Sequence, residues 1–180
     1  MKDGVLIIEC LDKDDPGSEG RLLKELFNLM QVASQRVRVA SIDKLLEALA
    51  DSAFRHVHIS THGSVTDDDE EKFRGLWTPK GVGTRHAVGR TPIKLACTSI
   101  VSTACKSGSK GFAKHVADQW GVKYYIAPAG SPFFYDAAFF ALTYYYKLFI
   151  NKLTVPKAFA SFAQNHENPH SFTLSRRNTT

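Results

Sequence analysis

The chain has 180 residues, 43% of them hydrophobic, and a formal net charge of +5. This length predicts a single domain over residues 1–180, with enough apolar side chains for one sizeable core. The charge does not indicate a nucleic-acid partner, because lysine and arginine are scattered and form no basic stripe interleaved with aromatic residues. No apolar run reaches the roughly 18 residues of a membrane span, so we expect no membrane partner.

Cysteine usage and the first residues bear on the compartment. Cys10, Cys97 and Cys105 are odd in number and irregular in spacing, with no paired framework, which predicts reduced thiols. The apolar stretch over residues 5–8 is too short for a secretory signal peptide. We therefore expect a cytoplasmic protein.

Strand and helix patterns alternate through the first third of the chain. The run over residues 5–10, which is apolar except at Glu9, predicts a strand buried on both faces. Ser18 and Ser41 are candidate N-caps, each followed by apolar residues at helical spacing. The predicted elements are a strand over 5–10, a helix from about 18 to 33, a strand over 37–40, a helix over 41–50 and a strand ending near 61.

Residues 64–91 form a long stretch without a strand or helix pattern. The stretch holds an acidic run over residues 67–71 and several glycine and proline positions. Irregular segments of this length in a compact domain are typically functional or mobile. We expect this one to be a mobile loop beside the active site, closing over substrate or meeting a regulator.

The alternation resumes in the second half. A β-rich run leads into Cys105, and Gly121 is placed to end the helix that follows. The predicted elements are a helix over 111–120, a strand over 124–127, a helix over 133–149 opened by Ser131 and Pro132, a helix from Thr154 to about 163, and a strand over 171–175 before a loose tail to 180. This order predicts an α/β fold, with an open, mostly parallel sheet and helices on both faces.

Two β-rich segments each end in a reactive side chain. Residues 56–63 end in His62 and Gly63, and residues 98–108 present Cys105 among small residues. Because the carboxyl ends of neighbouring parallel strands open onto one crevice, we expect the two side chains to meet there. The sequence therefore predicts a catalytic dyad, with Cys105 as the nucleophile and His62 as its base.

The two residue types define the expected chemistry. A free thiol has a pKa of ~8.5 and needs an imidazole, a positive charge or a helix N-terminus beside it to become a thiolate. His62 would supply the imidazole, and lysines after Cys105 add positive charge. Attack on a carbonyl creates an oxyanion, for which the backbone amides of Gly63 and Cys105 are the expected donors. We expect the other two cysteines to be structural.

The residues around both side chains resemble a known family. His62-Gly63 after an apolar run, and residues 102–108 with the sequence Ser-Thr-Ala-Cys-Lys-Ser-Gly, are similar to the histidine-glycine and Ser-Ala-Cys-x-Ser/Thr-Gly signatures of CHAT-domain peptidases. These peptidases belong to the caspase, metacaspase and separase superfamily. Residues 121–127, followed by Asp136 and a long helix, resemble a further motif of the family in the same order.

The resemblance, which covers about residues 55 to 175, implies a caspase-haemoglobinase-like fold. It implies a cysteine endopeptidase that cleaves a protein substrate without a cofactor, and a regulatory or sensor protein that controls it. It also places Asp136 near the substrate pocket, where a carboxylate would favour a basic side chain. The lysines near Cys105 could equally favour an acidic one.

Two other functions stay open on the residues alone. The chain could keep this fold as a catalytically silent module that binds a partner. His56, His58 and His62 share one face of an extended strand, which would suit a metal-dependent hydrolase, although no acidic residue stands beside them in the sequence. The dyad requires no metal. An electrophilic thiol probe separates it from the silent module, and chelator sensitivity separates it from the metal enzyme.

Overall fold

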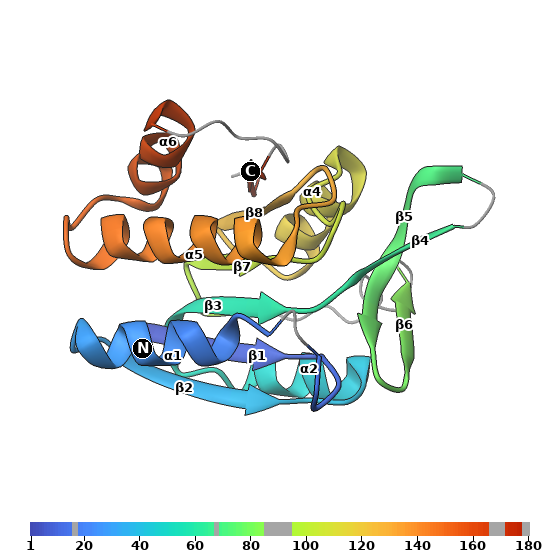
Figure 1. Cartoon of the computed structure of the whole chain (residues 1–180), viewed down its shortest axis with the longest axis horizontal. Helices are drawn as coiled ribbons and strands as arrows, with labels where there is room; N and C mark the ends of the chain where they lie inside the picture. Colours follow the sequence, from blue (N-terminus) through green and yellow to red (C-terminus); the bar gives the residue numbers. More distant parts are fainter. Residues whose placement is uncertain (16–17, 67–68, 85–94, 166–171, 178–180) are drawn as a thin grey trace.

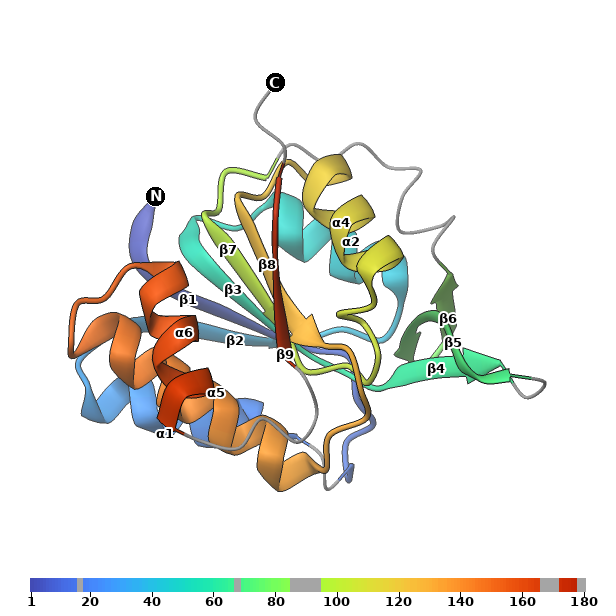
Figure 2. The same ribbon diagram turned by 90° about the horizontal axis from the view of Figure 1, so that it is seen from above.

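The computed structural model describes residues 1–15, 18–66, 69–84, 95–165 and 172–177 (Figure 1). The larger of its two sheets consists of β1 (Lys2–Glu9), β2 (Ala33–Arg38), β3 (Phe54–Ser60), β7 (Ser99–Ser102), β8 (Tyr124–Pro128) and β9 (Phe172–Arg176). Their order across the sheet is β2-β1-β3-β7-β8-β9 (Figure 2). All neighbouring strands are parallel except β9, which runs antiparallel to β8. The predicted open, mostly parallel sheet is confirmed.

Helices cover both faces of this sheet, as predicted. On one face lie α1 (Gly20–Leu29), α5 (Phe134–Phe149) and α6 (Val155–Asn165), and on the other lie α2 (Ile42–Ala50) and α4 (Lys110–Gln119) (Figure 2). Strand β1 lies between the two layers, because Val5 and Ile7 pack into one apolar cluster while Leu6 and Ile8 pack into the other. Its continuous apolar run therefore reflects burial on both faces.

A second, smaller sheet follows the third strand. It is antiparallel and contains β4 (Gly63–Thr66), β5 (Asp69–Thr78) and β6 (Gly81–Thr84), projecting beside the end of β3 (Figure 1). The expectation of an irregular loop was therefore wrong for residues 64–66 and 69–84. Gly81, with a φ of 131°, allows the tight reversal between β5 and β6. Residues 67–68 and 85–91 of the predicted loop lie outside the described residues.

Two helix starts differ from the prediction. Ser18 does not cap α1, because its hydroxyl donates a hydrogen bond to Glu9 and Glu19 occupies the N-cap position. That helix ends at Leu29 rather than near 33, since Gln31 adopts a left-handed φ of 55° and β2 follows. In α5, the N-cap is Phe133 rather than Ser131.

Other boundaries follow the predicted signals. The Ser41 hydroxyl accepts a hydrogen bond of 3.4 Å from the Lys44 amide and caps α2. Gly121, with a left-handed φ of 66°, follows the last residues of α4 and ends the helix. Strand β9 is the predicted terminal strand, while residues 171 and 178–180 lie outside the described residues. Among the helices described, none has the length and apolar character needed to cross a membrane.

Candidate active site

His62 and Cys105 meet at the carboxyl ends of neighbouring strands. Strands β3 and β7 are parallel, with Ile59 paired to Ser102, and the chain presents His62 and Cys105 just beyond these ends. Both line a small cavity of about 20 Å³. The cavity is bounded by Leu11, Glu19, Thr61, His62, Thr103, Cys105, Pro132, Phe134 and Ala137.

The imidazole of His62 is held from three sides. Its Nε2 lies 2.7 Å from Oδ2 of Asp15 in the loop after β1. The rings of Trp77 and Phe134 contact it, with centroids 5.7 Å and 5.6 Å away. With Nε2 bonded to a carboxylate, Nδ1 is the nitrogen that can exchange a proton with a thiol. The sequence interpretation missed Asp15, although it ends an acidic turn directly after a strand adjacent to the one that carries His62.

Cys105 sits in a tight, hydrogen-bonded loop. The amides of Lys106 and Gly108 donate to the carbonyls of Gly130 and Pro128, both at 2.7 Å, which ties the loop to the end of β8. Lys106 takes a left-handed φ of 58°, so the chain reverses directly after Cys105. The Cys105 side chain remains partly exposed in this loop.

The other two thiols lie in the core. Cys10 and Cys97 are both buried in the apolar cluster under α2 and α4. Burial raises the pKa of each thiol to about 12, with the nearby Glu9 charge contributing for Cys10. At neutral pH these two side chains are protonated thiols rather than nucleophiles.

Gly63 lies directly against the backbone of Cys105. A methyl group built on Gly63 would stand 1.9 Å from the carbonyl oxygen of Cys105 and 3.0 Å from its amide nitrogen. Only glycine permits this approach of the two chain segments. The two residues expected to form the oxyanion hole are therefore adjacent in space.

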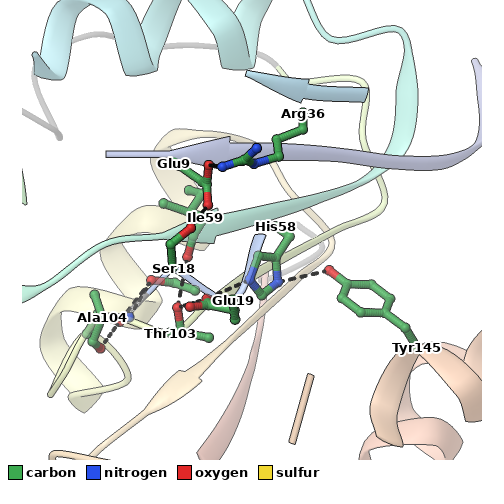
Figure 3. A network of polar contacts seen from close by, with 11 residues as sticks. Glu9, Ser18, Glu19, Arg36, His58, Ile59, Thr103, Ala104 and Tyr145 are labelled. Atoms are coloured by element: carbon green, nitrogen blue, oxygen red, sulfur yellow. Dashed lines mark hydrogen bonds and ion pairs between the residues drawn. The ribbon is translucent and has the colours of Figure 1, made fainter. Parts of the chain in front are cut away.

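A buried polar network lies behind the cavity (Figure 3). Oε1 of Glu19 accepts a hydrogen bond of 2.5 Å from the Thr103 hydroxyl and lies 2.9 Å from Nε2 of His58. His58 Nδ1 lies 3.4 Å from the Tyr145 hydroxyl. Burial alone would raise the pKa of the Glu19 carboxyl, but its bond to His58 and the Thr103 hydroxyl hold that pKa below its usual value. The network connects α5, β3 and the start of α1 to the residue two positions before Cys105.

A second buried carboxylate fixes the loop that carries Asp15. Glu9, fully buried at the end of β1, is paired with Arg36 at 2.5 Å and Arg38 at 3.3 Å. It also accepts a hydrogen bond from Ser18, which follows Asp15 by three positions in the chain (Figure 3). Buried charges of this kind are retained where they are fully paired.

Asp136 lies at the start of a helix, as the sequence predicted. It lies in the first turn of α5 and is half-buried, two positions after Phe134 and one before Ala137. Those two neighbours line the cavity, whereas Asp136 itself does not. The carboxylate that does line the cavity is Glu19, which the sequence interpretation did not single out.

The three histidines considered for a metal site have three different partners. His56 Nδ1 lies 2.7 Å from the Ser99 hydroxyl, whereas His58 bonds to Glu19 and His62 to Asp15. Burial lowers the pKa of His56 to about 4. Across the part of the chain that the structure describes, no three His, Cys, Asp or Glu side chains are grouped to hold a metal ion.

Comparisons with known proteins define the fold. No family model matches the sequence, and no curated protein matches it. The structure is similar to that of a secreted C11 cysteine protease from Bacteroides thetaiotaomicron, called iotapain, with a TM-score of 0.56 and 11% sequence identity. The match covers 97% of this chain and 66% of the protease chain, so the chain spans slightly less than two thirds of that protein. The chain therefore has the caspase-like fold of a cysteine protease clan.

Proposed function

We propose that the protein is a cysteine endopeptidase. The observation that carries this proposal is that Cys105 and the Asp15-bonded His62 line one cavity at the carboxyl ends of β3 and β7. Thiol-dependent acyl transfer requires an accessible thiol and a base, here Cys105 and His62, and a carboxylate such as Asp15 can orient the base. The caspase-like fold is consistent with this chemistry.

The arrangement supports the following reaction. Asp15 accepts the Nε2–H of His62, so that Nδ1 takes the proton of the Cys105 thiol. The thiolate attacks the peptide carbonyl carbon, and the backbone amides of Gly63 and Cys105 stabilise the resulting oxyanion. His62 then returns the proton to the leaving amine, which departs and leaves a thioester. Water, deprotonated by His62, hydrolyses this thioester and regenerates the thiol.

Substrate preference and control are further parts of the proposal. Asp136, in the first turn of α5 and next in the chain to Ala137 of the cavity lining, would attract a basic side chain of the substrate. Replacing Asp136 by Arg should then reduce cleavage next to Lys or Arg more than cleavage next to neutral residues. A regulatory protein that controls the enzyme remains part of the proposal, with no surface assigned to it.

The test is cleavage of a peptide library by the wild-type protein and by Cys105→Ala. We expect the wild type to cleave a subset of peptides and the variant to cleave none, because only the nucleophilic sulfur is lost. Cys97→Ala, which removes a buried thiol elsewhere, is the matched control and should retain activity. Cleavage that persists in Cys105→Ala would overturn the assignment. A wild type that cleaves nothing and reacts with no electrophilic thiol probe would point to a silent interaction module.

A further inference from the structure

An apolar groove opens between α1 and α5 next to the candidate active site. Leu22 of α1 contributes to one side, and Phe134, Tyr135, Ala138 and Phe139 of α5 contribute to the other. Its volume is about 460 Å³, within the range of cavities that hold ligands. The candidate cavity at Cys105 has only about 20 Å³, room for a water molecule but not for an amino-acid side chain.

The groove gathers large apolar side chains that are exposed to solvent. Leu22 is 49% exposed, Phe134 and Phe139 are each 48% exposed, and Tyr135 is 69% exposed. A single exposed apolar residue is ordinary, but several around one concave surface mark a binding groove. The amphipathic helices α1 and α5 thus expose apolar surface at this end, while Leu23, Phe27 and Phe140 of the same helices are buried in the apolar cluster beneath them.

The groove adjoins the candidate cavity at Cys105. Glu19 and Phe134 line both spaces. The ring of Phe134 also contacts the His62 imidazole, with the two centroids 5.6 Å apart. A peptide whose carbonyl carbon reaches Cys105 would therefore bring a neighbouring side chain to the groove.

We propose that this groove binds a bulky apolar side chain of the substrate, such as leucine or phenylalanine, from a residue within two positions of the scissile bond. This inference rests on the proposed peptidase function and names the substrate class for that site. An apolar pocket discriminates mainly by excluding water from apolar surface, which yields preferences of about 10- to 200-fold in kcat/KM. Ser18 and Glu19 add polar groups to the lining of the groove, with which the substrate backbone could form hydrogen bonds.

The first experiment measures a preference. Peptides that carry leucine or phenylalanine at each position near the cleaved bond are compared with peptides that carry serine there. We expect the wild type to favour one apolar position by about 10-fold or more in kcat/KM. Leu22→Ser, which removes an apolar wall, and Ala138→Trp, which fills the groove, should both bring this ratio towards one. Leu29→Ser is the matched control, because Leu29 lies on the same helix, is 83% exposed and is outside the groove.

The second experiment measures binding without catalysis. The Cys105→Ala protein is titrated into a fluorescently labelled peptide with the apolar residue, and anisotropy is followed with and without Leu22→Ser or Ala138→Trp. Weaker peptide binding in both double variants than in Cys105→Ala supports the proposed role of the groove, even if the wild type cleaves no peptide. In that case only the peptidase proposal fails. A different outcome is cleavage that depends on Cys105 but shows no apolar preference, or a preference that Leu22→Ser and Ala138→Trp leave unchanged. It would overturn the proposed role of the groove and leave the peptidase proposal standing.

Discussion

At the residue scale, the three thiols differ in burial, and the difference predicts which of them reacts. Cys10 and Cys97 are buried, and burial raises the pKa of each to about 12, whereas Cys105 is partly exposed in the cavity with His62. We expect iodoacetamide near neutral pH to modify Cys105 alone in the folded protein and all three thiols in urea. Mass spectrometry of the digested protein over time measures this. Equal rates at Cys97 and Cys105 in the folded protein would contradict it.

Asp15 gives a second prediction at this scale. Its carboxylate lies 2.7 Å from Nε2 of His62. In the proposed reaction it would orient the ring and stabilise the imidazolium that forms. Asp15→Asn removes the charge with little change in shape, so kcat should fall, by as much as about 10⁴-fold. Asp14→Asn, the adjacent exposed aspartate, is the control and should leave kcat within about 2-fold. Peptide-cleavage kinetics give the comparison. Equal kcat values for the two variants would mean that Asp15 has no part in the reaction.

At the element scale, the small sheet contacts His62 of the candidate site. The Trp77 amide in β5 donates a 2.9 Å hydrogen bond to the carbonyl of His62, and the Thr61 hydroxyl donates to the carbonyl of Trp77. These contacts involve the Trp77 backbone and therefore survive substitution of its side chain. The indole adds a ring contact to the imidazole, so β5 contributes to the orientation of His62 together with Asp15 and Phe134.

This arrangement separates Trp77 from another aromatic residue of the same strand. Trp77→Ala removes the ring that orients His62, so kcat should fall by roughly 10-fold or more, because misplaced catalytic groups are costly. Phe73→Ala is the control, since the ring of Phe73 packs against that of Phe112 in the core, with the two centroids 4.6 Å apart. Urea unfolding should show that both variants are less stable than the wild type. Kinetics, measured under conditions where both variants are folded, should show that Trp77→Ala loses far more activity than Phe73→Ala. Parallel losses of activity would mean that β5 supports the fold only.

The same elements show how far periodicity in the sequence reaches. Helix α2 and strand β1 were predictable, because a serine cap and a continuous apolar run are local signals. The β4–β6 sheet was missed, because glycines such as Gly75 and Gly83 weaken the strand pattern and the pairing that defines it is not local. Gly75 and Gly83 are required there by close contact with the opposite strand and with Ile42 of α2.

At the scale of the whole molecule, the sheet explains why the site could be foreseen in part. Alternating strands and helices imply a parallel sheet, and adjacent parallel strands bring His62 and Cys105 to one edge although 43 positions separate them in the numbering. The Asp15 contact spans 47 positions and depends on the path of a loop, for which the sequence carries no periodic signal. Strand order thus predicts which ends are close, but not which loop side chain completes a triad.

The opposite end of β3 affects the stability of the whole molecule. His56 is 5% exposed, packs against the ring of Phe149 and bonds to the Ser99 hydroxyl. Burial lowers its pKa from 6.5 to about 4 in the folded protein. Between these two values the unfolded chain binds a proton that the folded protein does not. The contribution of neutral His56 to stability is therefore fully present above pH 6.5 and declines as the pH falls towards 4, by up to about 3 kcal/mol.

His56→Gln tests this dependence, because glutamine can still bond to Ser99 and does not titrate. The free energy of unfolding, measured by urea denaturation from pH 8 to pH 4, should fall with pH in both proteins as other groups titrate. The wild-type curve should fall more steeply below pH 6.5, so that the gap between the two proteins narrows or reverses by pH 4. A gap that stays constant across this range would mean that His56 keeps an ordinary pKa in the folded protein, and that the core beneath α5 admits its charged form.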